Sequence, residues 1–148
     1  MVASIPQQRQ GFGILREMST RWIDNDAFGH MNNAVHFQFF DTIVNRTLAD
    51  LGTDQLPDDP TRFVVVETGC RYLAEIRYPD RVTLGLRVAH LGRSSVRYDL
   101  AMFREDEDQA AAVGYLIHVN TSRATGRPLA IPEGLHAALA VLHGDPKP

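Results

Sequence analysis

The sequence is poor in cysteine, with Cys70 as the only one among its 148 residues. No disulfide can therefore form within the chain, and there is no cluster of thiols to hold a zinc ion. This favours a reducing, cytoplasmic compartment. Cys70 itself is expected to be a small buried apolar residue.

An excess of positive charge is also missing, because 15 Lys and Arg stand against 18 Asp and Glu, for a net charge of -3. Such a balance offers no electrostatic surface for DNA or RNA. The longest apolar stretch, residues 110–117, is far shorter than the roughly 20 residues that span a bilayer. Residues 1–11 lack the basic start and apolar centre of a signal peptide. We expect a cytoplasmic protein without nucleic-acid or membrane partners.

What the sequence does contain is enough apolar residues, 44%, for one hydrophobic core. At this length we expect one domain over residues 1–148. Residues 13–22 suit a strand, and turn formers follow at 24–29. Apolar residues then recur at intervals of three and four from Phe37 to Leu51, which predicts a buried helix. Asn32 or Asn33 can cap its start and Gly52 can end it.

From Phe63 onward the pattern changes to a period of two, which favours strands. Residues 81–88 and 96–102 each predict a strand with one buried face, joined by a short turn into an antiparallel hairpin. A further strand is expected at about 111–121 and a short helix at 133–142. The layout is α+β, with an antiparallel sheet of about five strands around a long central helix.

The richest polar cluster, residues 21–34, lies just before that helix and contains two acids, a histidine and two asparagines. A carboxylate here can attack a thioester carbonyl or activate water, while N–H groups of the first helical turn can receive an oxyanion. Because a thiolate leaves readily, no strong general acid is needed, so such a site suits thioesters better than amides.

The spacing D-x-D-x-x-G-H-x-N-N over Asp24–Asn33, followed by an aromatic-rich helix, resembles the 4-hydroxybenzoyl-CoA thioesterase-like family of hotdog-fold acyl-CoA thioesterases. The resemblance covers about residues 13–140. It continues through Asp41-Thr42, Tyr72, Pro79-Asp80, Gly92-Arg93-Ser94-Ser95, His118 and Gly126-Arg127-Pro128.

This resemblance implies a hotdog fold that hydrolyses an acyl-CoA or related thioester without a cofactor. Asp26 falls on the family's catalytic aspartate, and Asn33 on the position whose backbone N–H binds the oxyanion. Some relatives carry the working acid within the helix, where Asp41 is the nearest candidate. The resemblance also implies a homodimer or homotetramer with active sites at the dimer interface.

The remaining polar residues allow more than one interpretation. His30 could orient the acid or contact substrate, or bond a loop carbonyl. Gly29 and Asn32 are expected beside the substrate, although Asn32 also suits a helix cap. Asp24 is interpreted as a loop organiser. Arg93, Ser94 and Ser95 could contact CoA, although they also suit an ordinary hairpin turn.

No histidine spacing predicts a metal site, and Glu67, in an apolar strand, is expected at a strand end or near the pocket. The acyl group could be fatty or aromatic, since Phe37, Phe39 and Phe40 suit either. Two other functions are open: a hotdog hydratase or dehydratase, and an acyl-CoA-binding module without turnover. The complete motif from Asp26 to Asn33 favours hydrolysis over both.

Overall fold

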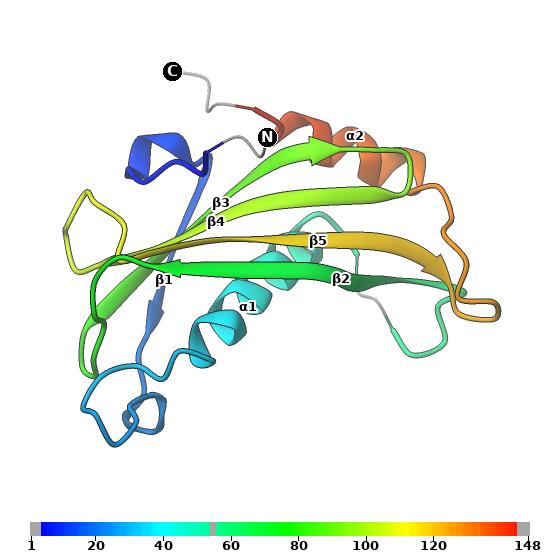
Figure 1. Ribbon diagram of the computed structural model, residues 1–148. Helices are drawn as coiled ribbons and strands as arrows, with labels where there is room; N and C mark the ends of the chain where they lie inside the picture. Colours follow the sequence, from blue (N-terminus) through cyan, green and yellow to red (C-terminus); the bar gives the residue numbers. More distant parts are fainter. Residues whose placement is uncertain (1–3, 54–55, 145–148) are drawn as a thin grey trace.

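Five antiparallel strands form one sheet with the order β1-β3-β4-β5-β2 (Figure 1). The computed structural model describes residues 4–53 and 56–144. The strands are β1 (Ile14–Ser19), β2 (Thr61–Tyr72), β3 (Arg81–Leu91), β4 (Ser95–Arg104) and β5 (Ala112–Ser122). The helices are α1 (Val35–Asp50), α2 (Glu133–Val141) and two short 3-10 turns, η1 (Arg9–Gly11) and η2 (Trp22–Asp24).

The sheet curves around α1, which lies across its inner face and contacts β3, β4 and β5 (Figure 1). Phe40, Ile43 and Val44 of the helix are buried in the same cluster as Tyr98 and Leu100 of β4. The apolar residues spaced with the helical period and those spaced with the two-residue period of a strand therefore pack in one core, as predicted. This is the hotdog fold, and the predicted α+β class is confirmed.

The start of α1 differs in detail from the prediction. Ala34 is the N-cap residue and makes no side-chain cap. Asn32 is close to the predicted role, because its side-chain oxygen accepts a hydrogen bond from the Ala34 N–H at 2.9 Å. The helix ends as expected before Gly52, whose φ of 91° suits a residue without a Cβ.

The prediction that strands 81–88 and 96–102 each bury a single face is wrong for their central residues. On the outer face of the sheet, Phe12, Ala101 and Phe103 form a second buried cluster, against which Ile5 packs. The N-terminal segment is fixed there by the Ala110 N–H, which donates to the Gln7 carbonyl at 2.8 Å. Residues before the expected core therefore cover part of the outer face.

The two edges of the sheet are β1 and the long strand β2. The pairing of β2 with β5 shifts register between Val65 and Glu67, which marks a β-bulge. Glu67 is exposed in mid-strand, so the alternative that it lies at a strand end is wrong. Within the described residues, no helix is long and apolar enough to cross a membrane.

Candidate active site

The loop before α1 is anchored by Asp24, whose side chain is only 1% exposed. One carboxylate oxygen accepts the Arg21 backbone N–H at 2.7 Å, and the other accepts two bonds from the Arg21 guanidinium at 2.8 and 3.1 Å. With both oxygens engaged, Asp24 fixes the entry of the loop. This agrees with its interpretation as a loop organiser.

The segment that follows β2 holds this loop from the other side. The Met31 N–H donates to the Ile76 carbonyl at 2.6 Å, and the Tyr78 N–H donates to the Asn25 side chain at 3.1 Å. The Tyr72 hydroxyl donates to the Asn33 carbonyl at 2.7 Å. Two segments far apart in the sequence are thus joined around the start of α1.

A pocket of about 290 Å³ opens between these two segments. It is lined by His30, Met31, Asn33, His36, Tyr72, Leu73, Ala74, Glu75 and Ile76. Two residues of the predicted site, His30 and Asn33, are therefore brought together in its wall. Asp26 belongs to the same loop but does not line the pocket.

Asn33, one of the residues that line this pocket, has a backbone N–H without a partner in the described part of the chain. The backbone N–H groups of the next two residues, Ala34 and Val35, donate to the side-chain oxygen and the backbone oxygen of Asn32, respectively. The Asn33 N–H has no hydrogen-bond partner among the described residues. An unpaired N–H beside the first turn of a helix is suited to bind a developing negative charge.

His36, in the first turn of α1, is a pocket residue that was not among the predicted site residues. Its side chain is buried, and Nδ1 lies 3.3 Å from the Asn32 carbonyl oxygen. Because a carbonyl only accepts, Nδ1 carries the hydrogen and Nε2 keeps its lone pair. Burial lowers the pKa of His36 and outweighs the backbone hydrogen bonds to Asn32 and Asn33, which raise it, so the neutral ring is favoured.

Nε2 of His36 makes no hydrogen bond with the described residues, and His36 is one of the residues that line the pocket. The ring packs edge-on against Tyr72, with centroids 4.8 Å apart. Its position on the helix face shared with Phe40 and Ile43 was a sequence signal that could have placed it inward.

Asp26 is half-buried, and one carboxylate oxygen accepts the Phe28 N–H at 2.9 Å. This turn lets the Asp26 N–H and carbonyl bond to His30 and Gly29, so the loop closes on itself. Gly29 takes a φ of 85°, which disfavours residues with a Cβ. The second carboxylate oxygen has no partner among the described residues.

For His30, the structure supports the interpretation that its ring bonds a loop carbonyl. Its Nδ1 lies 3.2 Å from the Met31 carbonyl oxygen, so the ring bonds a loop carbonyl. Its Nε2 lies 4.0 Å from a Glu75 carboxylate oxygen across the pocket. The ring also stacks on Phe28 at 6.4 Å.

Comparison with known proteins decides the family. Residues 20–139 match the model of the Thioesterase-like superfamily. The chain belongs to this superfamily. The PA5185 protein of Pseudomonas aeruginosa strain PAO1 is 41% identical, with a TM-score of 0.90 over 96% of this chain and 100% of that one.

Two further solved structures are similar. PA2801 of Pseudomonas aeruginosa, described as a candidate thioesterase, is 25% identical with a TM-score of 0.80, over 86% of this chain and 98% of that one. The 1,4-dihydroxy-2-naphthoyl-CoA thioesterase of Synechocystis is 14% identical with a TM-score of 0.80, over 86% and 96% respectively. The last of these shares the fold.

In this member of the Thioesterase-like superfamily, Gly29 and Asn32 adjoin the lining residues His30 and Asn33 in the loop, whereas the predicted residues of the hairpin turn lie apart from the pocket within one chain. Ser95 pairs with Val119 and Tyr72 with Ala112, seven positions apart on β5. That separation is about 23 Å at roughly 3.3 Å per residue. The hairpin turn with Arg93, Ser94 and Ser95 is therefore at the opposite end of the sheet (Figure 1). Asp41 is exposed on α1 and bonds Asn45.

The thiol of Cys70 is half-buried rather than fully buried. Burial raises its pKa to about 11, so the thiol stays protonated at neutral pH and is a poor nucleophile. Among residues 4–53 and 56–144, no group of three or more His, Cys, Asp or Glu side chains could hold a metal ion.

Proposed function

We propose that the protein hydrolyses the thioester bond of an acyl-CoA in the pocket at the start of α1. The observation that carries this proposal is the unpaired backbone N–H of Asn33, a residue that lines the pocket together with His36. Membership of the Thioesterase-like superfamily supports thioester chemistry. The Synechocystis neighbour, which acts on a naphthoyl-CoA, supports CoA as the carrier.

In the proposed reaction, the Asn33 N–H binds the carbonyl oxygen of the thioester and stabilises the negative charge that develops there. The free oxygen of Asp26 attacks the carbonyl carbon or removes a proton from an attacking water. His36 Nε2 accepts a hydrogen bond and so holds that water. The carbon–sulfur bond then breaks, and CoA leaves as the thiolate, which takes up a proton. If water is the nucleophile, the free acid is released directly. If Asp26 is the nucleophile, the acyl group is left as an anhydride on its carboxylate, and a water molecule then cleaves that anhydride to release the free acid and restore Asp26.

A second copy of the chain is proposed to enclose this site. The edge strand β2 leads into the pocket, and exposed apolar side chains surround its end and the neighbouring loop: Trp22, Ile23, Phe28, Tyr72, Leu73 and Tyr78. Apolar groups gathered in this way favour contact with another protein surface. Pairing along β2 would satisfy its free backbone groups and cover the pocket and Asp26 together.

The test is to incubate the protein with a panel of fatty and aromatic acyl-CoA thioesters and to measure hydrolysis as the release of free thiol. We expect thiol release with at least one substrate, and the better class identifies the acyl group. Binding of acyl-CoA without thiol release would instead indicate a binding module. Addition of water to an enoyl-CoA with the thioester intact would indicate a hydratase.

A further inference from the structure

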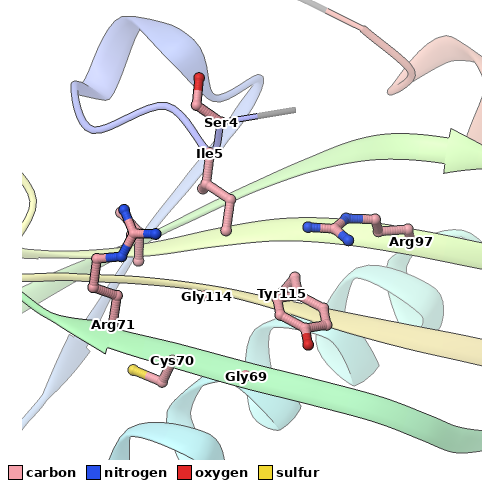
Figure 2. Close-up of a pocket in the computed structure, with 9 residues that line it drawn as sticks. Ser4, Ile5, Gly69, Cys70, Arg71, Arg97, Gly114 and Tyr115 are labelled. Atoms are coloured by element: carbon pink, nitrogen blue, oxygen red, sulfur yellow. The ribbon is translucent and has the colours of Figure 1, made fainter. Parts of the chain in front are cut away.

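A second pocket, of about 480 Å³, lies on the outer face of the sheet under the N-terminal segment (Figure 2). Arg97 of β4 pairs in register with Ile117, and Tyr115 of β5 pairs with Gly69 of β2. These residues alternate with the side chains that pack on α1, so they face away from the helix. The pocket is therefore separate from the proposed active site.

Arg97 enters this pocket in a fixed position. Its guanidinium carbon lies 4.4 Å from the centre of the Tyr115 ring, and its Nε lies 3.4 Å from the buried carboxylate of Asp99. Gly69 leaves space for that ring, because a Cβ there would lie 2.6 Å from it. One nitrogen, Nη2, is enclosed by the protein and has no hydrogen-bond partner among the described residues. The side chain as a whole is 17% exposed, so a ligand in the pocket would contact its other atoms.

Arg71 of β2 brings a second cation to the same pocket (Figure 2). Its side chain makes no hydrogen bond or ion pair with the described residues. Asp99 already pairs with Arg87 at 3.0 Å, and Glu67 is hydrogen-bonded to the Tyr115 hydroxyl. In and around the pocket, Arg71, Arg87 and Arg97 therefore outnumber the carboxylates of Asp99 and Glu67 by one positive charge. The chain as a whole carries a net charge of -3.

We propose that this outer pocket binds the phosphate group of a small molecule through Arg71 and Arg97. Guanidinium groups bind phosphate oxygens by paired, charge-assisted hydrogen bonds, and the side chains of Arg71 and Arg97 both line this pocket. The volume exceeds that of a phosphate alone, so the ligand is an organic phosphate.

The phosphate can come from two sources. Arg71 lines the outer pocket and the next residue, Tyr72, lines the proposed active site, so the two pockets lie on opposite faces of one strand end. The nucleotide of a bound CoA thioester could reach Arg71 around that end, which rests on the proposed function. A free nucleotide phosphate could bind without any link to hydrolysis.

The test is calorimetric titration of the full chain with adenosine 3′,5′-bisphosphate, which contains no thioester, so the result does not depend on hydrolysis. Arg71→Gln should weaken binding at least about tenfold, the low end for a hydrogen bond between charged groups. Arg97→Lys, which keeps the charge but loses the planar fork, should also weaken it. Arg62→Gln is the matched control, because Arg62 is exposed on β2 and lies outside this pocket.

The proposal would be overturned if the wild-type protein did not bind the bisphosphate at millimolar concentration. It would also be overturned if the Arg71 and Arg97 variants bound the bisphosphate as tightly as the wild type does. The source follows from a second measurement on Arg71→Gln. A raised KM for the CoA thioester with an unchanged KM for the matching N-acetylcysteamine thioester assigns the site to the CoA nucleotide. Unchanged KM values for both, with bisphosphate binding lost, assign it to a free phosphate ligand.

Discussion

The Tyr72 hydroxyl, at the end of β2, donates a 2.7 Å hydrogen bond to the carbonyl oxygen of Asn33. This bond fixes the peptide that precedes α1, and the same ring packs edge-on against His36. One side chain from the sheet edge therefore positions both the proposed oxyanion donor and the neutral histidine.

Tyr72→Phe should keep the ring contact with His36 and remove the bond to Asn33. Because this bond is partly exposed, we expect a loss of about 0.5–1 kcal/mol in unfolding free energy. Turnover should fall several-fold, since the Asn33 N–H becomes less well oriented. Urea unfolding and steady-state kinetics measure the two effects. Tyr78→Phe is the control, and equal kinetics in both variants would remove Tyr72 from the site.

His36→Asn tests the unprotonated Nε2. The shorter amide can still donate to the Asn32 carbonyl in the place of Nδ1 but offers nothing at Nε2. We expect turnover to fall at least about tenfold, with the circular dichroism spectrum unchanged.

The pH profile gives an independent readout of His36. Since burial lowers its pKa below the ordinary 6.5, the neutral ring persists at pH 7 and is lost only as the pH falls through that lowered value. Wild-type kcat/KM should decline on this acidic side. An identical acidic limb in His36→Asn would show that another group titrates there.

His118 should make stability depend on pH. Its ring is buried between Phe63 and Tyr98, Nδ1 has no partner among the described residues, and burial lowers its pKa to about 4. The unfolded chain therefore binds the proton first, and stability held above pH 6.5 is lost as the pH falls toward 4. The loss between pH 7.5 and 5 should be about 2 kcal/mol.

His118→Phe keeps the aromatic packing and removes the titration. Its unfolding free energy should change less than that of the wild type over the same pH range, as measured by urea unfolding. Parallel curves for the two proteins would contradict a buried neutral His118.

Self-association is expected through β2. Sedimentation of the wild type at micromolar concentration should give a species heavier than the 16.5 kDa chain. Val66→Lys places a charge on this exposed edge and should shift the equilibrium toward monomer, while Val141→Lys on exposed α2 should not. A wild-type protein that sediments only as a monomer would exclude the proposed enclosure of the site.

Much of the fold follows from local patterns in the sequence. The spacing of Phe40, Val44 and Leu48 predicts α1, and the alternation around Leu84 and Leu100 predicts the β3–β4 hairpin. Both patterns persist because each element buries one face in the common core. The burial of Asp99 was not predictable. Asp99 alternates with the core residues Tyr98 and Leu100, so the pattern places its side chain on a face expected to be exposed to solvent. Its ion pairs with Arg87 and Arg97 explain how the carboxylate can be buried there.

The candidate site was predictable where it is local. The motif from Asp24 to Asn33 forms one loop, so its acids, His30 and the helix start could be grouped from spacing alone. Tyr72 was not predicted as a wall of the pocket, because its contact with Asn33 joins residues 39 positions apart. Such a contact depends on how β2 ends beside α1, which no local pattern encodes.

The most direct test of the proposed function is the turnover of Asp26→Asn with the best thioester of the panel. The amide oxygen can still accept the Phe28 N–H, so the loop should fold, but the side chain can no longer attack or act as a base. Asp41→Asn, on the exposed side of α1, is the matched control and also tests the alternative helix acid. We predict a loss of at least about 100-fold for Asp26→Asn and near wild-type turnover for Asp41→Asn. Near wild-type turnover by a folded Asp26→Asn protein would contradict the assignment of Asp26 as the catalytic carboxylate.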